Sequence, residues 1–511
     1  MDINFSESKS GPLYVLIKSL SKSEKAYFKK FSSIHSSEKE KNYLKLFDLL
    51  DKMETFNQKI FEKRAFENSI AKNLSANKNY LYSLILRAMN TLYSYENSEN
   101  EIMELIKNYR FLLKKKLNVQ AAKMLNRAKS FAKENEMIQE QFLILNDERI
   151  QHANENKNIL QKQLSVIHQE FEKLLTILNK ECKMGIIYFD TYQLMSSDGV
   201  ARNKEILNTI KIKLEDANKL KQENLPETFV FNLRYFTFFE SYYFLTHDFK
   251  DAAGFSLEII SLYDSYPNRK RALIRNYVGA INNLLNALMR IPDFKRAETA
   301  MNKLEQLIRS NPEAEVPILE RLYHFKLLYY LNQGNYSEAQ VTVEDLIRWL
   351  STNETKVSKP KLLILYYDLS QYYFGVRDLK KALQYNNKIL NEFAEINYND
   401  FLTESRILHL LIHYEMKAFE YLGYKIAAFY RQLPQDKNIL KTERLAVQYL
   451  KKLISSNKEK ELELFKTFYK KIMDLLSDPF EKFLIEETRI KYWLRGKIEK
   501  KTIPDVILSP A

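Results

Sequence analysis

Glycine, proline and cysteine are all scarce in this chain. Its 511 residues include only 9 glycines, 11 prolines and 1 cysteine. Glycine usually makes up about 7% of a protein and proline about 5%. A β-sandwich, a barrel or a doubly wound sheet needs glycine at turns, bulges and tight corners. The shortage argues against all three folds and favours long α-helices joined by polar loops.

The few glycines and the single cysteine also exclude several kinds of site. Cys182 cannot form an internal disulfide or a zinc site built from several cysteines, and we expect it to be a small buried or half-buried side chain. The glycines lie far apart, which excludes a dinucleotide fingerprint, a phosphate-binding loop and a nucleophile elbow. Carboxylates are abundant, but no pattern isolates a catalytic pair. The sequence therefore predicts no enzymatic activity and no cofactor.

Long hydrophobic runs are missing as well. No run approaches the roughly 18 apolar residues of a membrane-spanning helix, and residues 1–11 lack the apolar stretch of a signal peptide. At 45% hydrophobic and 28% charged residues, the chain can still bury a large core beneath a solvated surface. We therefore predict a cytoplasmic protein without a membrane span.

The charge is basic, with a net value of +14. The excess lies near the ends: residues 1–100 carry 16 basic and 12 acidic side chains, and residues 431–511 carry 18 and 12. Residues 231–430 are almost neutral, with 24 and 23. Because lysine and arginine alternate with acidic residues along most predicted helices, the pattern indicates solvated helix faces rather than a basic stripe that follows nucleic acid.

Helical periodicity begins in an N-terminal segment, residues 1–98. The apolar spacing predicts helices over 13–20, 24–31, 43–53, 58–68 and 75–95. Residues 71–88 also have the polar start and apolar continuation of a DNA-recognition helix, with Lys78 and Asn79 as the residues that would contact bases. The preceding turn is short for that motif, so a structural helix is the favoured interpretation and DNA contact the alternative.

A short corner pattern recurs in the middle of the chain. A polar corner is followed by an aromatic or aliphatic residue, two polar residues and an alanine that opens the next helix. The four clear copies are residues 247–252 (HDFKDA), 292–297 (PDFKRA), 334–339 (GNYSEA) and 377–382 (RDLKKA). Their alanines are 45, 42 and 43 residues apart. This period predicts stacked helix pairs, because each pair leaves an apolar face that the next pair covers.

Weaker copies extend the array in both directions. One is predicted at Gly423 to Ala427, 45 residues after Ala382, and another ends at Ala121. Two degenerate repeats are expected between Ala121 and Ala252, near Ser165 and Asn208, although neither position has a corner motif. The alanines are expected to be buried, since a small side chain lets two helices approach closely.

The four central units resemble tetratricopeptide repeats. The matching positions are Tyr243, Phe249 and Ala252; Leu288, Phe294 and Ala297; Tyr330, Gly334, Tyr336 and Ala339; and Tyr373, Leu379 and Ala382. The resemblance is clear over about 233–430 and looser over 101–430. The repeats are longer than that family's 34 residues, and only one of the four corners has glycine. The resemblance implies an all-α fold, an α-solenoid of antiparallel helix pairs forming a superhelix with helical caps.

The resemblance also implies a binding groove lined by the first helix of each pair. Carried over position by position, the groove residues are Arg234, Ser241, Asn282, Asn286, Arg290, Arg321, His324, Asn332, Tyr367 and Gln371. In that family, asparagines and basic residues at such positions can hold a peptide carboxylate through charge-assisted hydrogen bonds. The alternative is that these residues simply face water.

Two further features complete the sequence. His409 and His413 are four residues apart, as zinc ligands on a helix can be, but no third ligand or catalytic glutamate accompanies them, so no metal site is predicted. The tail, residues 431–511, is expected to form a helical cap with helices over 441–453, 458–476 and 479–497, the last with Pro479 in its first turn.

Three segments are thus predicted: an N-terminal helical segment (1–98), a tetratricopeptide-like array (99–430) and a C-terminal cap (431–511). The favoured function is a non-enzymatic scaffold that binds a partner protein or peptide in its groove. The alternative is a transcriptional or other regulator, with nucleic acid contacted by the N-terminal segment and the array acting as a sensor.

Overall fold

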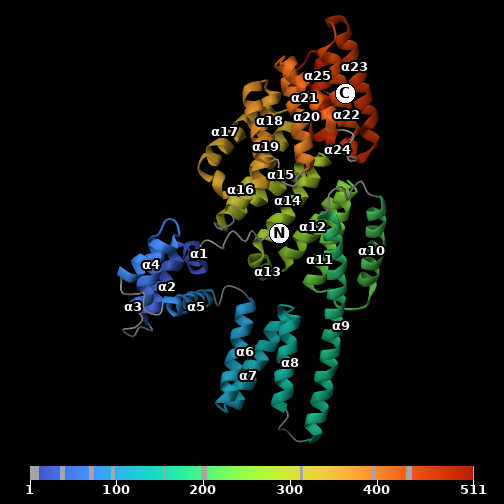
Figure 1. Cartoon of the computed structure of the whole chain (residues 1–511). Coiled ribbons are helices and arrows are strands. Elements are labelled where there is room, and N and C mark those ends of the chain that lie inside the picture. The colour runs from blue at the N-terminus through green and yellow to red at the C-terminus, as the bar shows by residue number, and fades with distance from the viewer. Residues whose placement is uncertain are drawn as a thin grey trace. The chain divides into compact units, whose positions relative to one another are not determined.

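The computed structural model describes residues 11–34, 41–67, 74–93, 98–152, 157–196, 204–310, 315–393, 399–432 and 440–509. Within these residues every regular element is a helix, so the all-α prediction is confirmed for the described chain (Figure 1). The chain divides into two compact units, Met1–Leu174 and Leu175–Ala511, with the division inside one long helix. The three predicted segments remain a prediction, and each unit is described by itself below.

The first unit begins with a cluster of five helices. They are α1 (Pro12–Ser19), α2 (Lys22–Ile34), α3 (Lys41–Lys52), α4 (Gln58–Glu67) and α5 (Leu74–Leu92). These bounds lie within three residues of the predicted ones, because each helix has a clear apolar face. Phe28, Phe47 and Phe61 are fully buried at its centre.

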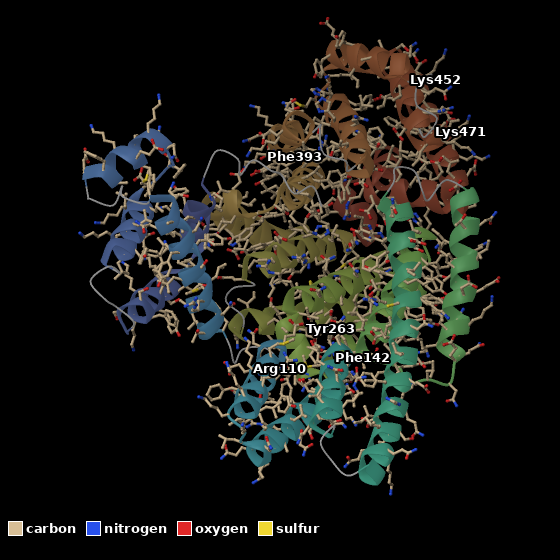
Figure 2. The ribbon with its side chains drawn as sticks, turned by 60° about the horizontal axis from the view of Figure 1, so that its bottom comes forward. Arg110, Phe142, Tyr263, Phe393, Lys452 and Lys471 are labelled. Atoms are coloured by element: carbon tan, nitrogen blue, oxygen red, sulfur yellow. The ribbon has the colours of Figure 1, made fainter. Side chains whose placement is uncertain are left out.

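Longer helices follow in the same unit. They are α6 (Ser98–Lys114), α7 (Asn118–Glu134), α8 (Ile138–His152) and the first part of α9 (Lys157–Ser196). Ala121 is buried where α7 packs against α6, as the corner pattern predicts. A salt bridge of 3.2 Å joins Arg110 of α6 to Asp147 of α8 (Figure 2).

The second unit contains the regular part of the chain. Its helices after α9 are α10 (Lys204–Gln222), α11 (Phe229–Leu245), α12 (Phe249–Ser265), α13 (Pro267–Ala272), α14 (Ile274–Arg290), α15 (Phe294–Ser310), α16 (Glu315–Asn332), α17 (Tyr336–Asn353), α18 (Lys359–Gly375), α19 (Leu379–Glu392), α20 (Asn399–Glu415) and α21 (Phe419–Gln432). Each helix from α14 to α21 packs against the next, and α14 with α16, α16 with α18 and α18 with α20 also meet. This packing of near neighbours is that of a helical repeat.

The corner pattern has a consistent structure. A residue with positive φ ends one helix at His247 (58°), Gly334 (72°) and Arg377 (65°). The next residue caps the following helix: the side chains of Asp248, Asn335 and Asp378 accept hydrogen bonds from the backbone three residues on. The four alanines 252, 297, 339 and 382 are completely buried, so their predicted burial is confirmed.

The weaker copy at Gly423 to Ala427 was placed wrongly. The corner lies six residues earlier, where Lys417 has a φ of 57° and α21 begins at Phe419. Leu422 is fully buried at the position that alanine holds elsewhere, while Ala427 is exposed. The corner pattern requires alanine at this position, so a corner with leucine does not match it.

No corners exist at the two degenerate positions. Ser165 lies inside the uninterrupted 40-residue helix α9, and Asn208 lies inside α10. A corner that the sequence did not show lies at Glu136, with a φ of 50°, between α7 and α8. Gln141 is buried at its alanine position, and its amide donates to the Ala132 carbonyl at 3.1 Å.

The C-terminal helices complete the second unit. They are α22 (Lys441–Ile454), α23 (Lys458–Asp474), α24 (Pro479–Glu487), α25 (Ile490–Glu499) and α26 (Ile503–Leu508). α24 begins at Pro479 as predicted, but the helix predicted over 479–497 is broken at Arg489, whose φ is 53°. Tyr449 of α22 stacks on Phe468 of α23, and the Lys452 and Lys471 ammonium groups lie over the Tyr449 ring (Figure 2). One hydrophobic core runs from residue 327 to residue 503, so these helices share it with the repeats.

Candidate functional site

The ten predicted groove residues lie on α11, α14, α16 and α18 of the second unit. We call these ten residues the first-helix face. Four of them contact the C-terminal segment, residues 479–509, which comprises α24, α25 and α26. These four are Arg290, Asn332, Tyr367 and Gln371. The structure therefore brings together residues from three successive first helices, around the chain's own end.

Glu487, the last residue of α24, makes the central contacts. Its backbone carbonyl accepts hydrogen bonds from the Tyr367 hydroxyl at 3.1 Å and from the Gln371 amide at 3.0 Å. Its carboxylate forms a 3.0 Å ion pair with Arg290. A free carbonyl exists here because the helix stops at Glu487. Three predicted groove residues thus hold the end of a helix of the same chain.

Arg489 fixes the same helix end from the other side. Its guanidinium donates to the Leu331 carbonyl at 2.9 Å and to the Asn332 amide oxygen at 2.7 Å. The residue is 6% exposed. A non-glycine residue with positive φ costs backbone free energy, which these two hydrogen bonds from a charged donor offset.

An aromatic contact lies beside this network. The Arg290 guanidinium is 5.2 Å from the ring centres of both Phe249 and Phe483, and Phe483 belongs to α24. The His247 ring lies 5.5 Å from each of the same two rings. Burial, followed by the nearby Arg290 charge, lowers the pKa of His247 to about 4.

The C-terminal segment is anchored by large buried side chains. They include Leu484, Ile485, Ile490, Trp493 and Leu494, each at most 4% exposed. Burying such side chains stabilises a fold by about 1.5–3 kcal/mol each, or on the order of 10 kcal/mol together. That is comparable to the whole stability of a typical domain, about 5–15 kcal/mol. The segment is therefore a permanent part of the fold rather than a flap that opens at little cost.

A buried pair lies deeper in the first-helix face. His324 Nδ1 is 2.6 Å from a carboxylate oxygen of Asp368, and Asp368 is 3% exposed. Burial raises the pKa of Asp368, while His324 acts in the opposite direction. The pair links α16 to α18 beside the contacts with the C-terminal segment.

Two cations gather where α16 and α18 begin. The Arg321 guanidinium donates to the Pro317 carbonyl and to Glu320, the latter at 3.0 Å. Lys361, in the first turn of α18, has its pKa lowered by burial and then by the positive charge of Arg321. Glu320 is the carboxylate that acts on both cations. The cluster, defined here as Glu320, Arg321 and Lys361, thus carries one more positive than negative charge.

The remaining four residues of the first-helix face are half-buried. The Arg234 guanidinium donates to the Glu181 carbonyl of α9 at 2.9 Å. Asn282 donates to Asn283 at 3.4 Å, and the Asn286 carbonyl accepts from Arg290 at 2.9 Å. Ser241 is the fourth. Arg234 and Asn282 thus use their side chains, and Asn286 its backbone carbonyl, in contacts within the second unit.

The sequence patterns did not reveal Glu320, Lys361, Asp368, Glu487 or Arg489. Glu320 and Asp368 each stand next to a predicted residue, Arg321 and Tyr367, and Lys361 lies seven residues before Asp368, two helical turns along the same side of α18. Glu487 and Arg489 lie more than 100 residues from their partners. No local pattern marks them.

The histidine pair on α20 is buried. The rings of His409 and His413 lie 4.5 Å apart, and His409 Nδ1 is 3.0 Å from the Asn386 amide oxygen. His409 Nε2 and His413 Nδ1 are buried without a hydrogen-bond partner. Burial lowers the pKa of both residues, in His409 to about 3. Within the described ranges, no three His, Cys, Asp or Glu side chains are arranged to hold a metal ion.

This burial predicts an acid-sensitive fold. The unfolded His409 takes up a proton near its ordinary pKa of about 6.5, whereas the folded residue resists protonation down to about 3. The unfolded state therefore binds more protons in this range, and stability falls as pH is lowered through it. Replacing His409 by asparagine is expected to reduce the slope of unfolding free energy between pH 6 and pH 4 by up to about 1.4 kcal/mol per pH unit. Urea denaturation of both chains at several pH values measures this slope.

The same substitution at His168, an exposed residue of α9, is the matched control. An unchanged slope in the His409→Asn variant would show that this histidine is not the source of the acid sensitivity.

The two candidate DNA-contacting residues differ in their exposure to solvent. The Lys78 ammonium lies 4.5 Å from the centre of the Phe61 ring, and burial lowers its pKa. Asn79 is exposed. Residues 71–73 of the predicted recognition helix lie outside the described residues, and α5 begins at Leu74.

Two further expectations concern single features. Cys182 is exposed on α9, so the expected buried or half-buried side chain was wrong. Among the described helices none is long and apolar enough to cross a membrane.

Comparison with known proteins identifies no relative. No protein-family model matches the chain, and no curated protein matches its sequence. The assignment of function therefore depends on the residues and contacts described above.

Proposed function

We propose that the chain is a non-enzymatic helical-repeat scaffold of the tetratricopeptide type, with longer helices than usual, that binds an acidic segment of a partner protein. The contact is made by the cluster of Glu320, Arg321 and Lys361. The observation that carries the proposal is the unbalanced charge of this half-buried cluster. Of its three residues, Arg321 belongs to the first-helix face and lies near the start of α16, whereas Asn332, which contacts the C-terminal segment, lies at the end of the same helix.

The cluster has the properties of a carboxylate-binding position. Arg321 lies in the second turn of α16 and Lys361 in the first turn of α18, so the positive ends of two helix dipoles lie near the same cations. The Arg321 side chain is 19% exposed, which leaves it partly shielded from water. Arg321 Nε is buried without a hydrogen-bond partner. A carboxylate from a partner would pair with both cations through charge-assisted hydrogen bonds.

The proposal predicts that removing both charges weakens binding. A fluorescein-labelled hexaglutamate peptide is the probe, and fluorescence anisotropy with increasing KCl is the measurement. Arg321→Gln combined with Lys361→Gln is expected to raise the Kd at least about tenfold, because hydrogen bonds to a charged group are lost. The control pair is Arg348→Gln with Lys380→Gln, exposed cations on second helices, which removes the same net charge.

Two outcomes would contradict the proposal while circular dichroism shows intact helices. One is equal weakening by the control pair, which would mean that only net charge matters. The other is the absence of any salt-sensitive binding of the peptide to the unaltered chain. A salt-sensitive complex with labelled duplex DNA, weakened by Lys78→Ala with Asn79→Ala, would instead favour the regulator.

A further inference from the structure

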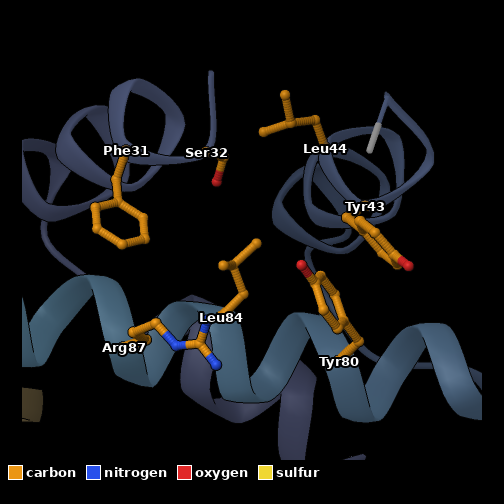
Figure 3. Close-up of a pocket in the computed structure, with 7 residues that line it drawn as sticks. All are labelled: Phe31, Ser32, Tyr43, Leu44, Tyr80, Leu84 and Arg87. Atoms are coloured by element: carbon orange, nitrogen blue, oxygen red, sulfur yellow. The ribbon is translucent and has the colours of Figure 1, made fainter. Parts of the chain in front are cut away.

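A small hollow lies among the N-terminal helices of the first unit. It has a volume of about 130 Å³ and is lined by residues of α2, α3 and α5 (Figure 3). Phe31, Leu44 and Leu84 form apolar walls. At one end the rings of Tyr43 and Tyr80 lie 4.4 Å apart. The hollow belongs to the first unit, whereas the first-helix face belongs to the second.

One polar group in this hollow is buried without a hydrogen bond. Ser32 is 7% exposed, and its hydroxyl has no hydrogen-bond partner. Figure 3 shows the Ser32 oxygen directed into the space between α2 and α5. A buried hydroxyl without a partner costs folding free energy. Its position is therefore more favourable when a ligand supplies the missing hydrogen bond.

The second polar group is the Arg87 guanidinium. Arg87 extends along the hollow from α5, beside Leu84 (Figure 3). Among the ion pairs of the described residues, none involves Arg87. A guanidinium presents its donors in a planar fork that matches a carboxylate. A cationic donor on the exposed Arg87 and the unpaired Ser32 hydroxyl thus face one small hollow that is lined by both polar and apolar groups.

We propose that this hollow binds a short-chain aliphatic carboxylate. The carboxylate pairs with Arg87 and accepts a hydrogen bond from the Ser32 hydroxyl, while the alkyl chain lies against Phe31, Leu44 and Leu84. The size fits, because an engineered cavity of about 150 Å³ holds benzene, which has six heavy atoms. A phosphate dianion fits less well, because Arg87 is the one charged side chain among the described residues that line the hollow, and it would balance only half of a dianion's charge.

Butyrate is the probe, and ligand-observed NMR with the full chain is the measurement. A Kd on the order of 1 mM is expected for a ligand of six heavy atoms. Arg87→Met is expected to weaken binding at least tenfold, whereas Arg64→Met, an exposed arginine of α4, leaves it unchanged. Butyramide, the neutral isostere, is expected to bind at least tenfold more weakly than butyrate.

Ser32→Ala provides a second and independent test. It is expected to weaken butyrate binding about threefold to tenfold, while leaving the unfolding temperature the same or higher, because the unpaired hydroxyl is removed. If Arg87→Met fails to fold, the butyrate affinity of Ser32→Ala tests the proposal by itself. Equal affinity for butyrate and butyramide would overturn the proposal, as would tighter binding of inorganic phosphate than of butyrate. Unchanged butyrate binding by Ser32→Ala would also overturn it.

Discussion

Replacing Arg489 by alanine is expected to lower the free energy of unfolding by about 3–5 kcal/mol, as measured by urea denaturation. The substitution leaves the Leu331 carbonyl and the Asn332 amide oxygen without the donor they have now. It also keeps a side chain at a φ of 53° after the compensating hydrogen bonds are lost. Both effects loosen the end of α24, whose carbonyl is held by Tyr367 and Gln371.

Arg489→Gly separates the two effects. Glycine loses the same hydrogen bonds but adopts positive φ freely, so this variant is expected to be about 1 kcal/mol more stable than Arg489→Ala. Lys482→Ala, an exposed change on α24, is the control and should stay within about 0.5 kcal/mol of the unaltered chain. Suppose instead that Arg489→Ala makes the C-terminal segment sensitive to protease but costs less than 1 kcal/mol. The segment would then be a detachable flap, and its assignment to the permanent core would be wrong.

Much of the helical framework could be predicted because its signals are local. Apolar residues at helical spacing define the N-terminal helices α1 to α5. The four central corners could be placed because a capping Asp or Asn and a buried alanine stand at fixed offsets, as in Asn335 and Ala339. These features act over one or two turns of helix, so their sequence pattern is sufficient.

Other corners were missed because different side chains do the same work. Leu422 and Gln141 stand where the recognised corners have a buried alanine, although Lys417 and Glu136 have the same positive φ as His247 and Arg377. Leu422 packs into the space between the two helices of its corner. Gln141 occupies the same position at its own corner, and its amide donates a hydrogen bond to the Ala132 carbonyl. Because the corner pattern is defined by its alanine, it does not predict these two corners at their true positions.

The covering of the first-helix face could not have been predicted from the sequence. Arg290, Asn332, Tyr367 and Gln371 are predicted ligand contacts, and all four contact the C-terminal segment. The break at Arg489 has no glycine or proline to mark it. It is held by hydrogen bonds to residues 157 and 158 positions away. Only the folded chain shows which part of the face stays available.

The second large effect is expected at Gly375, where α18 ends. A Cβ at this position would overlap the ring of Tyr336, the first residue of α17. Both residues are buried, so the ring cannot move aside without disturbing the core between α17 and α18. Gly375→Ala is therefore expected to lower the free energy of unfolding by about 2–3 kcal/mol in urea denaturation.

Gly254 provides the matched control for this prediction. It lies inside α12, and a Cβ there would meet no atom within 4 Å. Gly254→Ala is expected to stabilise the chain by up to about 1 kcal/mol, because alanine is the better helix former. Combining Gly375→Ala with Tyr336→Leu should cost less than the sum of the two single changes, since the smaller side chain leaves room for the methyl group. If the two changes are additive, contact with the Tyr336 ring is not the reason that glycine is needed where α18 ends.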